Sequence, residues 1–116
     1  MDLAILLTAT DPLGRTIALE ESQWRQHICV EHPGLRPEWI ARCLTTPDFV
    51  ARDATHAHRR VFYKKNYLPG RSIRRFYLKV VIELSTEEGD PAHVITAYIA
   101  SEAKLGEELE WPIRSN

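Results

Sequence analysis

The sequence predicts one α+β domain, in which an N-terminal hairpin and two helices pack on one face of a four-stranded antiparallel sheet. Apolar residues recur at helical spacing between residues 20 and 46, and they alternate with a period of two after Pro47. The connections between the alternating segments are short enough for hairpins, which favours antiparallel pairing. With 116 residues, 44% of them apolar, the chain can bury one core, so residues 1–116 are expected to form a single domain.

The N-terminal hairpin is predicted from two short apolar segments that flank a turn. Residues 3–8 and 16–19 have the composition of strands. Between them, Asp11, Pro12 and Gly14 are typical of a tight turn. A hairpin is therefore expected ahead of the first helix.

Two amphipathic helices are expected next. The first begins near Glu21, because acidic side chains favour a helix N-terminus, and it ends near the string His32-Pro33-Gly34. The second begins at Pro37 and ends before Pro47. Its apolar stripe is formed by Trp39, Ile40, Cys43 and Leu44.

Four strands are expected over residues 48–52, 59–67, 73–84 and 93–101, followed by a tail that includes Trp111. In a strand, successive side chains point to opposite faces of the sheet. The face expected in the core contains Phe76, Leu78, Val80, Ile82 and Leu84, joined by Ile95, Ala97 and Ile99. The opposite face, expected to be open, contains Arg75, Tyr77, Lys79, Val81 and Glu83, joined by Val94, Thr96 and Tyr98.

The charges are unevenly distributed, although the formal net charge is only -1. No acidic residue lies between Asp53 and Glu83, whereas that segment contains Arg59, Arg60, Lys64, Lys65, Arg71, Arg74, Arg75 and Lys79. The same segment contains the aromatic residues Phe62, Tyr63, Tyr67, Phe76 and Tyr77. Cations mixed with aromatic rings are typical of proteins that bind single-stranded nucleic acid. A twisted hairpin with an exposed basic face has the same composition.

Cysteine usage and hydropathy predict a cytoplasmic protein that does not contact a membrane. Cys29 and Cys43 are isolated, as free thiols in a reducing compartment are, and no stretch approaches the roughly 18 uncharged apolar residues of a membrane span. His56 and His58 have the spacing of two metal ligands on one side of a strand, but no further ligand accompanies them. We therefore expect no metal and no other cofactor.

Several strings, taken in order, resemble the phage-type branch of the BECR nuclease superfamily, which groups barnase, EndoU, colicin-type tRNases and RelE-like toxins. The strings are Trp24-Arg25-Gln26-His27-Ile28, His32-Pro33, Thr46-Pro47-Asp48, Arg60-Val61-Phe62-Tyr63-Lys64, Tyr77-Leu78-Lys79-Val80-Val81 and Val94-Ile95-Thr96-Ala97-Tyr98, followed by Lys104 and Gly106. The resemblance covers roughly residues 16–111. It implies a BECR-like fold and a metal-independent endoribonuclease, either toxin-like or derived from a mobile element.

The resemblance also implies roles for individual residues. In such an enzyme a base takes the proton of the ribose 2′-OH, which attacks the adjacent phosphorus, and an acid protonates the leaving 5′-oxygen. His27 would be the acid or base, with His32 as the alternative, since imidazole exchanges protons near neutral pH. Arg60 and Lys79 would bind the phosphoryl oxygens, where charge accumulates, and Thr96 and Tyr98 would position the substrate. The expected RNA-binding surface consists of Arg59, Tyr63, Lys64, Arg75 and Tyr77.

Other functions fit the same residues. The basic face could hold RNA or a protein partner without catalysis, or the sheet edge could pair with a strand of another protein. The expected partners of a nuclease are RNA and, for a toxin, an antitoxin or immunity protein. The acidic flanks could alternatively shield the site within the chain.

Overall fold

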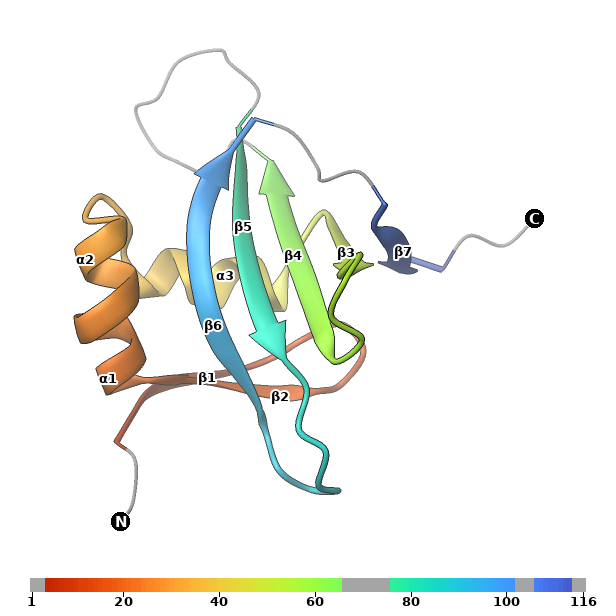
Figure 1. Ribbon diagram of the computed structural model, residues 1–116, viewed down its shortest axis with the longest axis horizontal. Coiled ribbons are helices and arrows are strands. Elements are labelled where there is room, and N and C mark those ends of the chain that lie inside the picture. The colour runs from red at the N-terminus through yellow and green to blue at the C-terminus, as the bar shows by residue number, and fades with distance from the viewer. Residues whose placement is uncertain (1–3, 66–75, 102–105, 114–116) are drawn as a thin grey trace.

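The computed structural model describes residues 4–65, 76–101 and 106–113. Its elements are β1 (Ile5–Thr10), β2 (Thr16–Glu20), α1 (Glu21–Gln23), η1 (Trp24–Ile28), α2 (Cys29–Glu31), α3 (Pro37–Thr45), β3 (Phe49–Arg52), β4 (Arg59–Lys65), β5 (Tyr77–Glu83), β6 (Ala92–Ala100) and β7 (Glu108–Trp111). The strands of this described part form a seven-stranded sheet in the order β1-β2-β6-β5-β4-β3-β7 (Figure 1). Neighbouring strands are antiparallel except β2 and β6, which run parallel.

This mixed sheet shows that the expected four-stranded antiparallel sheet was wrong. The four expected strands are present as its centre, in the order β6-β5-β4-β3. The hairpin extends one side through the parallel pairing of Ile17 with Ala92. On the other side, β7 pairs with β3, so the segment expected to be a tail is a strand. Both additions occupy edges of the central sheet, where unpaired backbone groups would otherwise face solvent.

The helices also differ from the expected arrangement. α3 lies behind β4 and β5 in Figure 1, whereas α1, η1 and α2 form a continuous helical segment beside β6. Within that segment Trp24–Ile28 is π-helical, and the N–H of Cys29 donates to the carbonyl of Trp24. A π-helical turn contains more residues than an α-helical turn, so it changes which side chains share a face. Trp24 and Ile28 of this turn nevertheless both pack against the hydrophobic core, as helical spacing in the sequence predicts.

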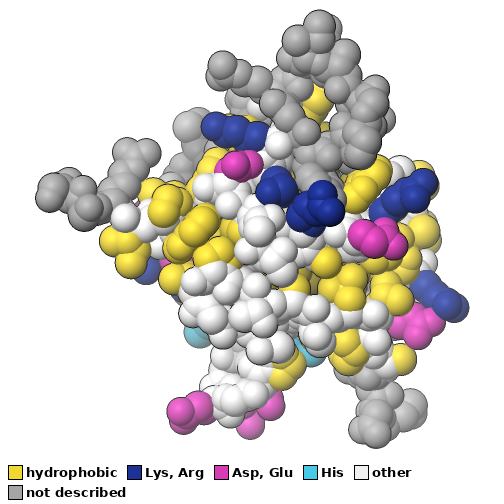
Figure 2. Space-filling model, turned by 180° about the vertical axis from the view of Figure 1, so that it is seen from behind, with side chains coloured by type: hydrophobic (Ala, Val, Ile, Leu, Met, Phe, Trp, Pro, Cys, Tyr) yellow, Lys and Arg dark blue, Asp and Glu magenta, His cyan; other side chains and the backbone are white. Residues whose placement is uncertain are grey.

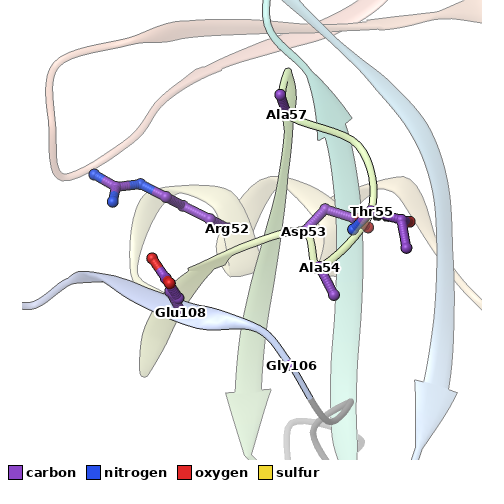
Figure 3. Close-up of a pocket in the computed structure, with 7 residues that line it drawn as sticks. All are labelled: Arg52, Asp53, Ala54, Thr55, Ala57, Gly106 and Glu108. Carbon is purple, nitrogen blue, oxygen red and sulfur yellow. Dashed lines mark hydrogen bonds between the residues drawn. The ribbon is translucent and has the colours of Figure 1, made fainter.

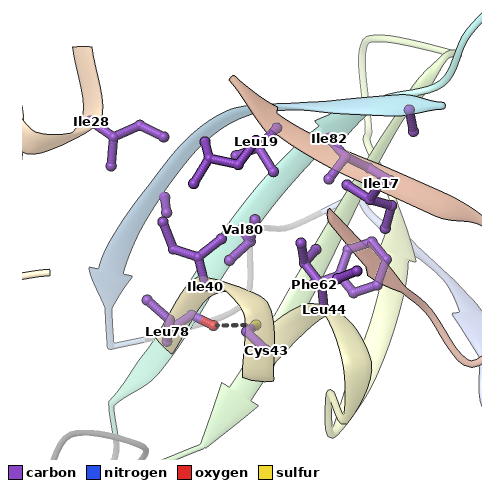
Figure 4. Close-up of a cluster of buried hydrophobic side chains, with 14 of the residues drawn as sticks. Ile17, Leu19, Ile28, Ile40, Cys43, Leu44, Phe62, Leu78, Val80 and Ile82 are labelled. Atoms are coloured by element: carbon purple, nitrogen blue, oxygen red, sulfur yellow. Dashed lines mark hydrogen bonds between the residues drawn. The ribbon is translucent and has the colours of Figure 1, made fainter. Parts of the chain in front are cut away.

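The main core lies between α3, the hairpin and one face of the sheet (Figure 4). Its fully buried side chains come from these three parts and from η1: Ile17, Leu19, Ile28, Ile40, Leu44, Val50, Phe62, Val80 and Ile82. The predicted stripe of the second helix is confirmed, because Ile40, Cys43 and Leu44 are buried there. The Cys43 thiol donates to the carbonyl of Leu78, and burial raises its pKa far above the ordinary value, so it is a packed thiol of low reactivity.

The opposite face of the sheet carries a second, smaller cluster. It contains Ala51, Val61, Tyr63 and Val81, with Phe49, Tyr77, Ile95 and Tyr98 packed against them. The position of Ile95 corrects the sequence prediction. Val81 pairs with Thr96 but Ile82 pairs with Val94, so a bulge at Ile95 reverses the expected faces of Val94 and Ile95. Thr96 and Tyr98 keep the face predicted for them.

Candidate functional site

A tyrosine, a lysine and a second tyrosine form a row across the sheet face opposite α3. Tyr63 on β4 pairs in register with Lys79 on β5, which pairs with Tyr98 on β6. Side chains at directly paired positions lie on the same face of a sheet. The sequence prediction that Lys79 and Tyr98 share a face with Tyr77 and Thr96 is therefore confirmed.

Lys79 is buried between the two tyrosines. Lys79 is only 4% exposed, and its ammonium lies 4.8 Å from the ring centroid of Tyr63 and 5.4 Å from that of Tyr98. Such contacts stabilise a cation through the electron-rich ring faces. Among the described residues, Lys79 forms no hydrogen bond or ion pair with a carboxylate. The Lys79 ammonium has three N–H donors, and an anion bound to them would offset the free-energy cost of burying its charge.

His32 extends this row at the Tyr98 end. It follows α2 as the helix C-cap, and its N–H donates to the carbonyl of Ile28. Its ring stacks on Tyr98, with ring centroids 5.9 Å apart and an interplanar angle of 29°. Thr96 lies on the same face and pairs with Val81, one row away from Lys79. We call His32, Tyr63, Lys79, Thr96 and Tyr98 the Lys79 site.

Aromatic side chains extend the surface at the Tyr63 end. Phe49 stacks on Tyr63 at 4.5 Å between centroids, and Tyr77 meets both rings edge-on, at 5.5 Å from Tyr63 and 5.8 Å from Phe49. The Tyr63 hydroxyl donates to the carboxylate of Glu107, and Tyr63 is fully buried. The Lys79 site is therefore closed beside Tyr63, whereas His32 and Tyr98 are half-buried.

His27 does not join the Lys79 site. It is part of the π-helical turn, where its Nδ1 lies 3.6 Å from the carboxylate of Glu31 and its side chain is 42% exposed. His32, the alternative considered from the sequence, is the histidine that contacts a member of the row. The string His32-Pro33-Gly34 predicted the end of a helix at His32, and a side chain at the end of a helix can point toward a neighbouring sheet.

Arg60 lies on the other face of the sheet, opposite to Lys79. It pairs with Ile82, which belongs to the main core. Its Nε donates to Glu110 on β7 at 2.6 Å, and its guanidinium also donates to the carbonyls of Ala57 and Arg59. The structure therefore does not bring Arg60 and Lys79 together on one phosphate, as the sequence predicted.

Glu110 and Arg60 belong to a network that ties β7 to the N-terminal hairpin. Arg15 donates to Glu110 at 2.7 Å and to Asp11 at 2.6 Å. Burial works against the charged forms, but hydrogen bonds outweigh it. Those from Arg15 and Arg60 lower the pKa of Glu110, and those to Glu110 and Asp11 raise the pKa of Arg15. These four residues form a structural latch between segments distant in sequence.

The remaining predicted RNA-binding residues do not form one basic surface. Arg59 lies on the face of Lys79 and is 3.6 Å from Glu83, whereas Lys64 lies on the α3 face and donates to Thr46. Arg75 lies outside the described residues, as do Arg71, Arg74, Tyr67 and Lys104. On the face seen in Figure 2, dark-blue Lys and Arg side chains occur in several separate places, with magenta Asp and Glu side chains among them.

A separate polar hollow of about 380 Å³ lies beside the turn after β3 (Figure 3). Its lining includes Arg52 and Glu108, which are paired on the neighbouring strands β3 and β7, and Asp53 and Thr55 from the turn. Burial disfavours the Asp53 carboxylate, but hydrogen bonds from the N–H groups of Thr55 and His56 and from the Thr55 hydroxyl lower its pKa well below the ordinary value. Its oxygen Oδ1 is thus occupied in holding the turn.

Within the described ranges, no three His, Cys, Asp or Glu side chains lie close enough together to hold a metal ion. No helix of the described chain is long and apolar enough to cross a membrane. No family model, curated protein or solved structure matches the chain. A proposal about the function of this chain therefore depends on the geometry of its own residues.

Proposed function

We propose that the Lys79 site cleaves RNA without a metal ion, by attack of a ribose 2′-OH on the adjacent phosphodiester. The observation that supports this is the placement of an imidazole, an ammonium and two hydroxyl-bearing side chains on one sheet face: His32, Lys79, Thr96 and Tyr98. These are the groups that the reaction needs to transfer a proton, stabilise an anion and orient a ribose. The RNA enters beside Tyr98 and His32, because the Tyr63 end is closed.

The reaction follows from these groups. His32 accepts the proton of the 2′-OH, the 2′-oxygen forms a bond to phosphorus, and the P–O5′ bond breaks. Lys79 stabilises the charge that develops on the phosphoryl oxygens, and water donates a proton to the leaving 5′-oxygen. Tyr98 and Thr96 hold the ribose and phosphate in position. The products are a 2′,3′-cyclic phosphate end and a 5′-hydroxyl end.

Two histidines in one stretch of chain provide a matched test. We expect His32→Ala to reduce cleavage of RNA in EDTA by about 10²- to 10⁴-fold, as for loss of a general base. His27→Ala, which alters an exposed side chain paired with Glu31, should leave the rate within a few-fold of the wild type. Mass spectrometry of the RNA fragments identifies the cyclic phosphate. Equal losses in the two variants, or no cyclic phosphate from the wild type, would refute the proposal.

Lys79 needs a variant that preserves packing between the two tyrosines. Lys79→Met keeps an unbranched apolar stem there while removing the charge, so we expect a folded protein with cleavage reduced by about 10²- to 10³-fold. Arg60→Met should reduce stability rather than the rate per folded molecule, because Arg60 lies on the other face. A loss of cleavage confined to Arg60→Met would contradict the assignment.

RNA binding without catalysis is the second candidate function. The 4% exposure of Lys79 favours it over cleavage, because cleavage requires a phosphoryl oxygen to reach the Lys79 ammonium, whereas retention of RNA does not. In the same assay this function gives retention of intact RNA on the protein. Such retention should weaken steeply as salt rises, since phosphate contacts release counterions.

A further inference from the structure

The helical segment formed by α1, η1 and α2 runs alongside β6 (Figure 1). In the described part of the chain, β2 pairs with β6 only at Ala92 and His93, so the helical segment neighbours the rest of β6 on that side. Two side chains link this segment to β6: Gln23 near its beginning and His32 directly after its end. The position of His32 therefore depends on how the segment is attached to β6.

Gln23 binds the backbone of β6 at its bulge. Ile95 is the extra residue of this bulge and has no paired residue on β5. The side-chain amide of Gln23 donates to the Ile95 carbonyl, and both residues are half-buried. Among the described residues, this is the one hydrogen bond between the helical segment and β6. The Ile95 carbonyl is adjacent to Thr96, so Gln23 attaches the segment next to a member of the Lys79 site.

His32 makes the second contact, farther along β6, where its ring stacks on Tyr98. His32 follows Gln23 by nine positions, which is about 2.5 turns of an α-helix with about 3.6 residues per turn. A regular α-helix would therefore direct the two side chains to opposite sides. The π-helical turn contains more residues per turn, and His32 itself has the non-helical angles φ −134° and ψ 70°. These two irregularities allow both side chains to contact the same strand.

The hydrogen bond of Gln23 supplies a constraint that the apolar contacts of the segment do not. Trp24 and Ile28 pack against the main core. Such contacts are non-directional, so they hold the segment against the core without fixing its position along β6. A hydrogen bond to a single carbonyl does fix that position, because it weakens steeply when its distance or angle changes.

We propose that Gln23 is a positioning residue of the Lys79 site, whose hydrogen bond to the bulge fixes the helical segment along β6 and thereby holds the His32 ring against Tyr98. In the proposed reaction His32 accepts the proton of the 2′-OH, so its position determines how well a bound ribose is aligned for attack. The effect of Gln23 on cleavage rests on the proposed function, whereas its effect on the His32 ring does not.

Replacing Gln23 with methionine tests the hydrogen bond. Gln23→Met keeps an unbranched side chain and removes the N–H donor. The matched control is Gln26→Met, the same exchange at an exposed position of the same segment. The ring-proton signals of His32 are followed by nuclear magnetic resonance, and Tyr98→Leu gives their positions without the stack. We expect these signals to move toward the Tyr98→Leu positions in Gln23→Met and to stay at wild-type positions in Gln26→Met.

The kinetics of RNA cleavage test the consequence for the reaction. We expect Gln23→Met to lower kcat by about 10- to 100-fold, because a small misplacement of a catalytic group is that costly. KM should stay within about 2-fold of the wild type, since Gln23 is not part of the Lys79 site. Gln26→Met should leave both constants unchanged. Gln23→Glu has a side chain of the same length without an N–H donor at neutral pH, and it should reproduce the effects of Gln23→Met.

The outcomes separate the two proposals. Displaced His32 signals in Gln23→Met and Gln23→Glu, but not in Gln26→Met, support the positioning role, and they overturn the ribonuclease proposal alone if the wild type does not cleave RNA. Thermal melting curves show which variants are folded. Wild-type His32 signals in a folded Gln23→Met or Gln23→Glu overturn the positioning role, even if Tm falls, and leave the ribonuclease proposal standing. Cleavage with unchanged kcat in both Gln23 variants also overturns the positioning role.

Discussion

Replacing Glu110 with glutamine tests whether the latch stabilises the fold. The Glu110 side chain is 10% exposed and binds Arg15 at 2.7 Å and Arg60 at 2.6 Å. Removing one member of a fully buried ion pair costs about 3–5 kcal/mol, whereas an exposed pair contributes about 0–1 kcal/mol. The side chains of Arg15 and Arg60 retain 22% and 14% exposure. We therefore expect the free energy of unfolding to fall by about 2 kcal/mol, and Tm by roughly 5–10 °C.

Urea and thermal unfolding followed by circular dichroism measure this change. The matched control is Glu83→Gln, since Glu83 is 54% exposed and lies 3.6 Å from Arg59. That control should alter the free energy of unfolding by less than about 0.5 kcal/mol. The double variant Arg60→Met with Glu110→Gln should lose less than the sum of the single losses, because the two residues share an interaction. Equal effects of Glu110→Gln and Glu83→Gln would refute the latch.

The pH dependence of stability provides an independent check of the latch. Although burial opposes its charge, the hydrogen bonds from Arg15 and Arg60 lower the folded-state pKa of Glu110 below the ordinary value of 4.5. Such a group contributes its full stabilisation above that ordinary pKa and loses it as pH falls toward the folded-state pKa. The stability difference between the wild type and Glu110→Gln should therefore narrow below pH 4.5. A difference independent of pH would contradict this mechanism.

Two further predictions concern the turn after β3. Asp53→Ala should destabilise the fold by about 1 kcal/mol, comparable to loss of a helix cap. Because the pKa of Asp53 is lowered in the folded state, its contribution should begin to decrease as pH falls below the ordinary value of 3.8 and should be lost only at the lower folded-state pKa. Urea unfolding from pH 7 down to about pH 2 follows this decrease. Asp53→Asn, which keeps an accepting oxygen, should lose less than Asp53→Ala. Gly106→Ala should cost about 1 kcal/mol or more, since Gly106 has φ +87° and an added Cβ would lie 3.3 Å from that of Ala54. Gly34→Ala meets no atom within 4 Å and should be nearly neutral in the same melts.

Local patterns in the sequence predicted the central part of the fold. The stripe from Ile40 to Leu44 identified the face of α3, and alternation around Lys79 placed this residue with Tyr98. Both patterns depend only on the geometry of one helix or strand. The face shared by Lys79, Thr96 and Tyr98, which is most of the candidate site, was therefore accessible from the sequence.

The remaining features depend on contacts or local irregularities that periodicity does not encode. His27 lies in a π-helical turn and contacts Glu31 rather than the predicted site, and the bulge at Ile95 exchanged the faces of two residues. Arg60 had the sequence context of a phosphate ligand, but its partner Glu110 lies on a strand that was expected to be a tail. Partners that distant in the sequence leave no local pattern.

The parallel pairing of β2 with β6 has a consequence for folding of the chain. Ile17 must wait for Ala92, so β2 pairs with no strand other than β1 until β6 has emerged from the ribosome. Contacts between such distant segments slow folding, because closing a long loop precedes the stabilisation it brings. During that interval the edge of β2 is available to other strands. Once β6 has paired with β5, its free edge is the one on which the hairpin is finally captured.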